Sequence, residues 1–306
     1  MAFVLVTGGT GFIGSHIVQR LLGGGHRVAV MTRNPGHARV PAGAEVRPGD
    51  VEDAASLREA MSGVDTVVDA VQFPNHPVEN PRRGYTYMAV DGLGTERQVQ
   101  AARASGVGHF VYLSGAGTRP GQTAPWFLAK LHAEKAIRES GLRHTIFRPS
   151  WVYGPEDRSL NKFVTFARML PVVPVIGNGQ TRVQPVHVDD LAEAVARTVG
   201  TPGTADQVYE IGGPQNLTMD EIIQTMLSVM GKRRRLIHQP AWLMKLLTAP
   251  LTLLPTPPLS PAAVDFVLME ESVDNTAVMC DLGLRLRPLD EGLEYLCPEQ
   301  GSIRQT

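Results

Sequence analysis

The sequence predicts a doubly wound α/β fold, in which parallel strands are joined by helical crossovers. Three observations lead to this prediction. Strand-like and helix-like patterns alternate up to Arg148-Pro149, a glycine-rich turn joins the first strand pattern to the first helix pattern, and proline-rich segments follow later. Strict alternation indicates a parallel sheet covered by helices. The 306 residues also allow a smaller lobe beside that sheet.

Apolar runs and apolar periodicity place the individual elements. The expected strands are Phe3–Val6, Arg27–Met31, Ala44–Arg47, Val64–Ala70, Phe110–Leu113 and Thr145–Phe147. The expected helices between them are Ile13–Leu22, Ala54–Met61, Tyr87–Ser105 and Phe127–Ser140. Asp53 has the residue type of an N-cap for the second of these helices.

The rhythm changes after Pro149, where prolines become frequent and two more helices are expected, at Leu191–Val199 and Met219–Met230. We therefore predict a small, mainly helical C-terminal lobe. Such a lobe is expected to lie across the carboxyl ends of the strands, where open α/β sheets bind ligands. The predicted division is a first domain of 1–150, to which 178–200 returns, and a lobe of 151–177 and 201–306.

Composition narrows the class of protein. The chain is 43% hydrophobic and 19% charged with a net charge of -1, which gives no reason to expect a nucleic-acid partner. Its two cysteines, Cys280 and Cys297, are too few for a disulfide framework and fit a reducing cytoplasm. The strand pattern starts directly after Met1, so no signal peptide is expected.

One segment raises the question of membrane contact. The basic run 232–235 precedes an apolar stretch, 242–255, that is interrupted by Lys245 and Pro250 and is too short to span a bilayer. The basic run is expected to be solvated at the end of the helix Met219–Met230, where cations also favour the helix dipole. If it is instead coupled to the apolar stretch, residues 232–255 would make peripheral contact with an anionic membrane surface. The alternative is that the apolar stretch walls a pocket for a hydrophobic substrate.

The run from Thr7 to Gly14 has the composition and context of a phosphate-binding turn. Gly8 allows the tight turn, Gly11 lets the backbone approach a pyrophosphate, and Gly14 lets the helix lie close to the strand. The pyrophosphate would take the unpaired amides at the helix start. The residues expected to bind cofactor in this turn are Gly8, Thr10, Gly11, Phe12, Ile13 and Gly14. We predict a dinucleotide-binding, Rossmann-type domain.

The end of the second strand indicates which dinucleotide. It carries Arg33 where an acid would accept hydrogen bonds from a free ribose 2′-hydroxyl. An arginine can pair with a 2′-phosphate, so NADP(H) is favoured over NAD(H). The alternative is that Arg33 is a solvated loop residue.

With these motifs in this order, the chain resembles the short-chain dehydrogenase/reductase superfamily in its extended and atypical branches. Besides the turn, Gly49-Asp50-Val51 looks like the segment that contacts adenine. The stretch 147–155 looks like the lining of the nicotinamide end, and 184–191 looks like a late strand-to-helix element. The resemblance adds further cofactor-binding candidates, namely Asp50, Val51, Ala70, Val71, Lys130 and Pro149.

The resemblance breaks at the groups that handle protons. Members acting on alcohols and carbonyls use a tyrosine acid/base, a lysine four residues later and a serine after the fifth strand. Here the lysine position is Lys130 but the tyrosine position is Trp126, whose indole is not an acid or base at physiological pH. The serine position falls on Gly115, beside Ser114. Lys130 and Ser114 are thus the candidates for any catalytic role.

The branch that the chain resembles most contains the NADPH-binding accessory subunit of respiratory complex I and its bacterial relatives. We therefore expect a protein that holds NADP(H) for redox, assembly or sensing purposes, with a protein complex as partner. The second hypothesis is an NADPH-dependent reductase of a hydrophobic conjugated substrate such as a quinone or enone. A nucleotide-sugar epimerase or dehydratase is disfavoured. It would need another acid, for which the candidates are Tyr85, Tyr87, Tyr112 and Tyr153.

No metal site is expected. His187 and the pair Asp189-Asp190 are explained by a satisfied histidine and an N-cap carboxylate at a strand-to-helix junction. Asp65 and Asp69 share one face of a strand, but Asp65 lies near the start of that strand and is expected to be solvated. No second acid stands opposite Asp69 for a paired-carboxylate mechanism.

Overall fold

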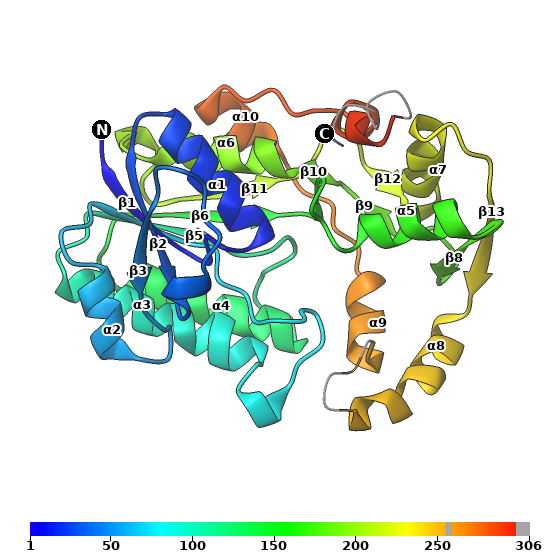
Figure 1. Ribbon diagram of the computed structural model, residues 1–306, viewed down its shortest axis with the longest axis horizontal. Helices are drawn as coiled ribbons and strands as arrows, with labels where there is room; N and C mark the ends of the chain where they lie inside the picture. The colour runs from blue at the N-terminus through cyan, green and yellow to red at the C-terminus, as the bar shows by residue number, and fades with distance from the viewer. Residues whose placement is uncertain (255–256, 258, 298–306) are drawn as a thin grey trace. The chain divides into compact units, whose positions relative to one another are not determined.

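The computed structural model describes residues 1–254, 257 and 259–297 (Figure 1). By its internal contacts this chain divides into two compact units. The first unit consists of Met1–Pro149, Val188–Ile211 and Asp274–Arg285. The second unit takes the rest of the described chain.

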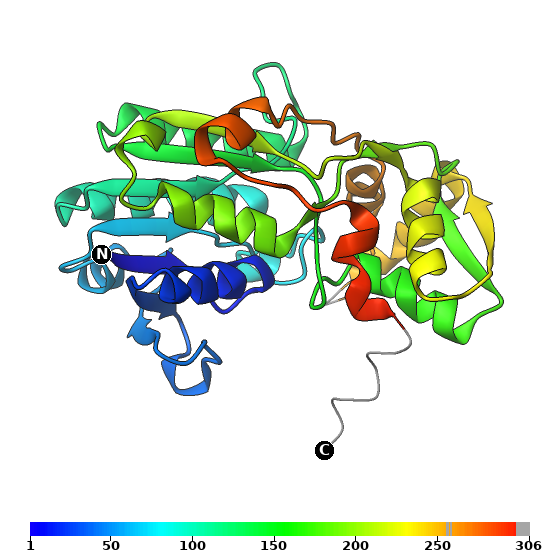
Figure 2. The ribbon, with the colours of Figure 1, turned by 90° about the horizontal axis from the view of Figure 1, so that it is seen from above.

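A seven-stranded parallel sheet forms the centre of the first unit (Figures 1 and 2), which confirms the predicted fold class. Its strands are β1 (Phe3–Thr7), β2 (Arg27–Thr32), β3 (Glu45–Pro48), β4 (Thr66–Asp69), β5 (His109–Leu113), β6 (His144–Pro149) and β11 (Gln207–Ile211). Their spatial order is β11-β6-β5-β4-β1-β2-β3. The order reverses between β1 and β4, and such a reversal marks the place where open α/β sheets bind ligands.

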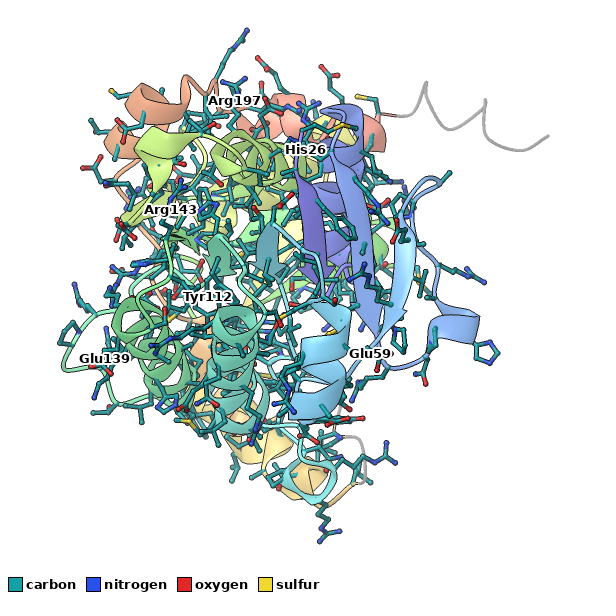
Figure 3. All side chains as sticks on the ribbon, turned by 90° about the vertical axis from the view of Figure 1, so that its left-hand side faces the viewer. His26, Glu59, Tyr112, Glu139, Arg143 and Arg197 are labelled. Atoms are coloured by element: carbon teal, nitrogen blue, oxygen red, sulfur yellow. The ribbon has the colours of Figure 1, made fainter. Side chains whose placement is uncertain are left out.

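Helices cover both faces of this sheet (Figure 3). One face carries α1 (Phe12–Gly23), α6 (Val188–Thr198) and α10 (Thr276–Leu282), and the other carries α2 (Ala54–Ala60), α3 (Leu93–Ala104) and α4 (Pro125–Glu139). The helices α1 and α6 lie side by side (Figure 2) and are joined by an ion pair between Arg20 and Glu193. The side chain of Asp53 accepts a hydrogen bond from Ala55 N–H at the start of α2, as predicted for an N-cap.

Two features of the first unit differ from the sequence prediction. Residues Tyr87–Gly92 form a π-helical turn before α3, so the expected helix 87–105 is not a uniform α-helix. The strand β11 has no counterpart among the predicted strands, and the predicted division places its residues in the C-terminal lobe. It pairs with β6 at the edge of the sheet, where a strand exposed on one side can carry polar residues such as Gln207 and Glu210.

The second unit is built from short elements around its own apolar core. Its strands are β7 (Val152–Tyr153), β8 (Val172–Ile176), β9 (Arg182–Val183), β10 (Val186–His187), β12 (Leu217–Thr218) and β13 (Arg235–Gln239). Its helices are α5 (Leu160–Met169), α7 (Met219–Val229), α8 (Ala241–Thr248), α9 (Pro261–Val267) and α11 (Leu289–Gly292). Pro174 lies within β8, which pairs with β13 alone, so its missing N–H breaks no ladder on the other side.

None of the described helices is long and apolar enough to cross a membrane. The apolar stretch beginning at Trp242 forms α8 and a following turn, Pro250–Leu253. Its predicted end at Pro255 lies outside the described residues, as do residues 298–306 of the predicted lobe.

Candidate functional site

The glycine-rich turn follows β1 at the point where the strand order reverses. Gly8 has a φ of 74°, and a Cβ there would collide with the carbonyl of Ala70 at the end of β4. A Cβ at Gly14 would collide with the Gly8 carbonyl, and the Gly11 N–H donates to that same oxygen over 2.9 Å. The backbone therefore requires glycine at two of the three motif positions, Gly8 and Gly14, because a side chain fits at neither.

The start of α1 offers backbone amides to a ligand. Gly11 precedes the helix in an extended conformation, and no described side chain caps this end or places an acid in its first turn. The first amides of a helix lack intrahelical partners and carry partial positive charge. The Phe12, Ile13 and Gly14 amides could thus hold a phosphate, as the sequence predicts.

A pocket of about 230 Å³ lies beside this turn, within the first unit. Six of the predicted cofactor-binding residues line it, namely Gly8, Thr10, Arg33, Asp50, Val51 and Val71. The pocket is also lined by residues outside the prediction, including Asn34, Glu52, Gln72, Phe73, Tyr85 and Val90. Most of these follow the ends of β2, β3 and β4, so parallel strand ends supply the pocket from segments far apart in the chain.

Arg33 is exposed and stands at one side of the pocket. Its guanidinium lies 5.7 Å from the centre of the Tyr85 ring. Asp50 and Glu52 also line the pocket, but neither carboxylate forms an ion pair with Arg33 in the described structure. Arg33 thus offers a cationic group at the pocket that no described carboxylate neutralises.

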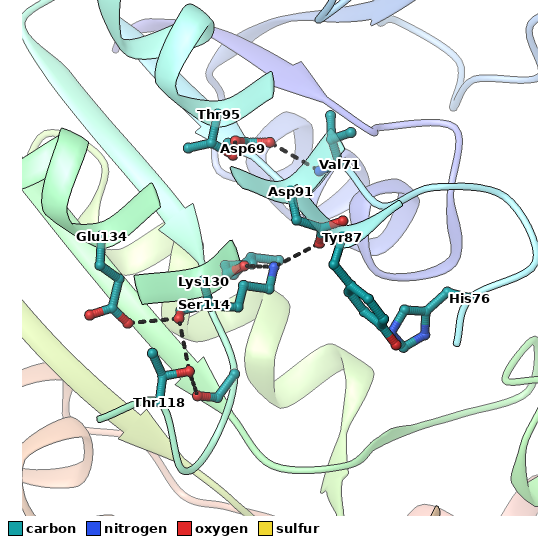
Figure 4. A network of polar contacts seen from close by, with 12 residues as sticks. Asp69, Val71, His76, Tyr87, Asp91, Thr95, Ser114, Thr118, Lys130 and Glu134 are labelled. Atoms are coloured by element: carbon teal, nitrogen blue, oxygen red, sulfur yellow. Dashed lines mark hydrogen bonds and ion pairs between the residues drawn. The ribbon is translucent and has the colours of Figure 1, made fainter. Parts of the chain in front are cut away.

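Asp69 holds the strand ends around the turn in place (Figure 4). Its carboxylate accepts hydrogen bonds from Val71 N–H at 3.0 Å and Thr95 Oγ1 at 2.7 Å, both residues labelled in the figure. It also accepts from Thr7 Oγ1 at 3.1 Å and Gln98 Nε2 at 2.9 Å. A buried carboxylate with this many donors is a structural group. Its role is to fix the loop after β4, not to act as half of a carboxylate pair.

Lys130 forms a second polar group, on α4 (Figure 4). Its Nζ lies 3.1 Å from the Asp91 carboxylate, 3.0 Å from the Leu113 carbonyl and 5.1 Å from the centre of the Tyr112 ring. Burial acts to lower the pKa of the Lys130 ammonium, but Tyr112 and Asp91 together raise it above its ordinary value. Burial raises the pKa of Asp91, which Lys130 opposes. Lys130 is thus a stabilised cation and a poor proton donor.

Trp126 stands one turn before Lys130 on the same helix. It belongs to an aromatic cluster in which the Tyr87 ring lies 6.1 Å from the indole, 4.9 Å from Phe73 and 5.4 Å from His76. Burial lowers the pKa of His76 to about 3 and raises the pKa of Tyr87 well above its usual range. Neither group would exchange a proton readily near neutral pH.

Ser114 is engaged by a charged network (Figure 4). Its hydroxyl donates to Glu134 at 2.7 Å, and Glu134 also accepts from Arg148 and Arg138, each at 2.7 Å. Burial acts to raise the pKa of Glu134, but these hydrogen bonds outweigh it and lower that pKa. The arrangement holds Ser114 as a donor to a carboxylate, and it links β5, α4 and β6.

The other tyrosines named as alternative acids lie in three different places. Tyr112 points from β5 to the side of the sheet that carries α3 and α4 (Figure 3), and burial raises its pKa above the ordinary value. Tyr85 lines the pocket at the glycine turn. Tyr153 lies in the second unit, where its ring packs 5.3 Å from that of His187. The raised pKa values of Tyr87 and Tyr112 are opposite to the tuning that acid/base catalysis requires.

Several candidates do not line the pocket: Gly11, Phe12, Ile13, Gly14, Ala70, Lys130, Ser114 and Pro149. Pro149 ends β6, where its carbonyl accepts from Ala116 N–H at 2.8 Å. The expected N-cap role of Asp189 and Asp190 is wrong, because α6 begins at Val188 and places both inside its first turn. The Asp189 carboxylate lies 2.6 Å from His16 Nδ1 on α1.

Asp65 accepts a hydrogen bond from Phe3 N–H at 2.7 Å and is exposed, as expected for its place near the strand start. In the described part of the chain, no group of three or more His, Cys, Asp or Glu side chains is arranged to hold a metal ion.

Sequence reasoning missed the partners of the predicted residues. Asp91, the partner of Lys130, is distant from it in sequence, and no local spacing connects the two. Tyr85, beside Arg33, comes from the long segment between β4 and α3, where no strand or helix period guides a prediction. Glu134 carried a signal, since it lies one turn after Lys130 on the predicted helix.

Fold and site together define an NAD(P)-binding Rossmann protein of the extended short-chain dehydrogenase/reductase class. Comparison with known families supports this assignment. Residues 4–212 match the model of the NAD dependent epimerase/dehydratase family. Since the match covers more than half of the chain, the chain belongs to that family.

Individual relatives differ in what they do. NADH dehydrogenase (ubiquinone) 1 alpha subcomplex subunit 9, mitochondrial, of Arabidopsis thaliana is 28% identical over 80% of this chain and 62% of its own length. The chain therefore spans less than two thirds of that relative. The 2-alkyl-3-oxoalkanoate reductase of Stenotrophomonas maltophilia is 28% identical over 76% of each protein.

The fold also recurs in solved structures. The triphenylmethane reductase of Citrobacter sp., solved as a complex with NADP(H), superposes with a TM-score of 0.72 over 96% of this chain and 99% of that one, at 23% identity. At this level of identity the likeness establishes the fold alone.

Proposed function

We propose that this protein binds NADP(H) and holds it without the proton transfer usual in its family, serving a redox, assembly or sensing role beside a protein complex. The observation that carries the proposal is Trp126, one turn before Lys130 on α4. The indole cannot exchange a proton near neutral pH. The neighbouring Tyr87 has a raised pKa, so it does not replace the missing acid.

The binding part of the proposal rests on the glycine turn and its pocket. The first amides of α1 would hold the pyrophosphate, and Asp50 and Val51 would contact the adenine. Lys130 and Pro149 would lie toward the nicotinamide end. When bound, the dinucleotide would supply a hydride. This chain's own residues would orient it, because Gly8 and Gly14 let the turn pack closely against the end of β4 and the start of α1.

Arg33 supports NADP(H) as the preferred dinucleotide. The end of β2 carries no acid that would accept hydrogen bonds from a free 2′-hydroxyl, and the Arg33 guanidinium faces the pocket without a carboxylate partner in the described structure. A guanidinium suits a phosphate, to which it can donate two parallel hydrogen bonds.

A protein-complex partner is supported by the similarity to a subunit of mitochondrial NADH dehydrogenase. The second unit also offers an apolar contact surface on α8, where Trp242, Leu246 and Leu247 are 67%, 64% and 58% exposed. Exposed apolar patches of this kind mark interaction sites. Peripheral membrane contact is the alternative use of the same helix.

The second candidate function is an NADPH-dependent reductase of a hydrophobic conjugated substrate. It is favoured by the similarity to the 2-alkyl-3-oxoalkanoate reductase, which covers most of both chains. The ion pair of Lys130 with Asp91 counts against it, since it stabilises the charged lysine. A nucleotide-sugar epimerase or dehydratase is a third and weaker candidate, because Trp126 stands at the tyrosine position.

Identification of the nucleotide that copurifies with the protein tests these functions. The protein would be denatured, the released nucleotide identified, and the folded protein then mixed with NADPH and a panel of quinones and enones while absorbance at 340 nm is followed. Bound NADP(H) that is not consumed supports the holder. Steady oxidation with any substrate establishes the reductase, and bound NAD(H) contradicts the cofactor assignment.

A further inference from the structure

The Arg33 guanidinium has an aromatic neighbour, the ring of Tyr85. The two groups lie 5.7 Å apart, and both line the pocket beside the glycine turn. A guanidinium within about 6 Å of an aromatic centroid is attracted by the negative face of the ring. The attraction matters here because Arg33 is exposed, and a free arginine side chain would otherwise sample many rotamers.

Backbone hydrogen bonds and core packing hold Tyr85 in place. Asn80 and Tyr85 form a bridge in which each N–H donates to the other's carbonyl, at 2.7 Å and 3.1 Å. The intervening turn contains a short helix, Pro81–Arg83, and Gly84 with a φ of 74°. The Tyr85 ring is half-buried and packs against the core of the first unit. Tyr85 is therefore packed in place, whereas Arg33 is exposed.

We infer that Tyr85 is a positioning residue that holds Arg33 over the pocket for recognition of a ribose 2′-phosphate. This inference rests on the proposed NADP(H) binding and adds a residue from a segment outside the glycine turn. Preorganising the guanidinium lowers the entropy cost of pairing with the phosphate. Tyr85 would thus raise affinity for 2′-phosphorylated nucleotides and leave affinity for unphosphorylated ones nearly unchanged.

Two small nucleotides test this at the adenosine end alone. Adenosine 2′,5′-bisphosphate carries the 2′-phosphate, and adenosine 5′-monophosphate lacks it. Calorimetry of the full chain would give both dissociation constants. The ratio used here is the dissociation constant of adenosine 5′-monophosphate divided by that of adenosine 2′,5′-bisphosphate, so a high ratio means a preference for the 2′-phosphate. In Tyr85→Leu, which keeps apolar packing but removes the ring, we expect this ratio to fall by about two- to fivefold. Tyr85→Phe should keep the original ratio, because it retains the ring.

Two further variants separate the possible failures. Arg33→Ala should reduce the ratio by about tenfold or more, and adding Tyr85→Leu should then change nothing further. Arg82→Ala is the matched control, since it removes an exposed arginine of the same turn that does not line the pocket.

Each outcome has one meaning. Equal weakening of both nucleotides in Tyr85→Leu would overturn the inference and make Tyr85 a simple adenine contact. A ratio that depends on Arg33 but not on Tyr85 would overturn the positioning role of Tyr85 and leave the NADP(H) preference intact. A wild-type ratio near one, or one unchanged in Arg33→Ala, would overturn the NADP(H) preference itself and the role of Tyr85 with it.

Discussion

Polar groups near the glycine turn line an open pocket, whereas the Lys130 ammonium and the Ser114 hydroxyl are each held by a carboxylate. Both regions belong to the first unit. Arg33 lines the pocket and lacks a carboxylate partner within the described residues, and the nearby start of α1 lacks a side-chain cap. Around α4, Lys130 is paired with Asp91, and Ser114 with Glu134. The first region is arranged to receive a ligand, whereas the second already engages its ammonium and its serine hydroxyl within the protein.

The difference teaches which part of the family's machinery this chain retains. Binding depends mainly on backbone geometry at the strand ends, and that geometry is intact. Proton transfer depends on side chains whose pKa values lie near neutral pH. The chain has Trp126 at the key position, and the buried tyrosines around it have raised pKa values.

The largest expected effect comes from breaking the Lys130 pair. Asp91→Ala leaves a buried ammonium without its carboxylate, so we expect unfolding free energy to fall by about 3–5 kcal/mol in urea titrations. Lys135→Ala, which removes a weak exposed pair with Glu139 on the same helix, should cost less than about 1 kcal/mol. A loss below about 1 kcal/mol for Asp91→Ala would show that the pair is not ionised.

A slightly smaller effect is expected at the glycine turn. Gly14→Ala places a Cβ against the Gly8 carbonyl, so the turn must shift away from the geometry that a pyrophosphate needs. We expect the dinucleotide affinity measured by calorimetry to fall by about 100-fold, from about 3 kcal/mol of strain. Gly23→Ala is the control, because its Cβ meets no atom within 4 Å at the other end of α1. Unchanged affinity in Gly14→Ala would remove the turn from the site.

The Glu134 network makes a smaller and pH-dependent contribution. The lowered pKa of Glu134 means that its stabilisation is present above the unfolded pKa of 4.5 and is lost as pH falls through the folded pKa. Glu134→Gln should therefore lower the free energy of unfolding by about 2 kcal/mol at pH 7. The gap to wild type should close on acidification below pH 4.5, whereas exposed Glu139→Gln should show no gap. A gap independent of pH would contradict this account.

The sequence predicted the region of the glycine turn and its pocket better than the region around Lys130. The glycine turn can be recognised from local sequence, since the backbone contact that requires Gly14 lies within the motif itself, although the contact that requires Gly8 is made by Ala70 after β4. Lys130 could be placed only by resemblance, and Asp91 could not be predicted because their contact depends on how the π-helical turn packs against α4. Tyr85 could not be predicted for the same reason. The edge strand β11 was missed because its polar residues weaken the strand-like pattern of apolar residues.

The smallest expected effect would come from restoring the tyrosine alone. In Trp126→Tyr, NADPH oxidation at 340 nm with carbonyl substrates should stay within about threefold of wild type, because acid catalysis needs the complete set of groups. The serine position would still be Gly115, and Ser114 would still donate to Glu134.

A Cβ added at Gly115 would meet no atom within 4 Å, so Gly115→Ser should be accommodated. We expect Trp126→Tyr/Gly115→Ser to exceed either single variant by about tenfold or more. Equal rates in the wild type, the two single variants and the double variant would mean that the Lys130–Asp91 pair is what prevents carbonyl reduction. A large gain from Trp126→Tyr alone would mean that the missing tyrosine is the only group that the site lacks for catalysis.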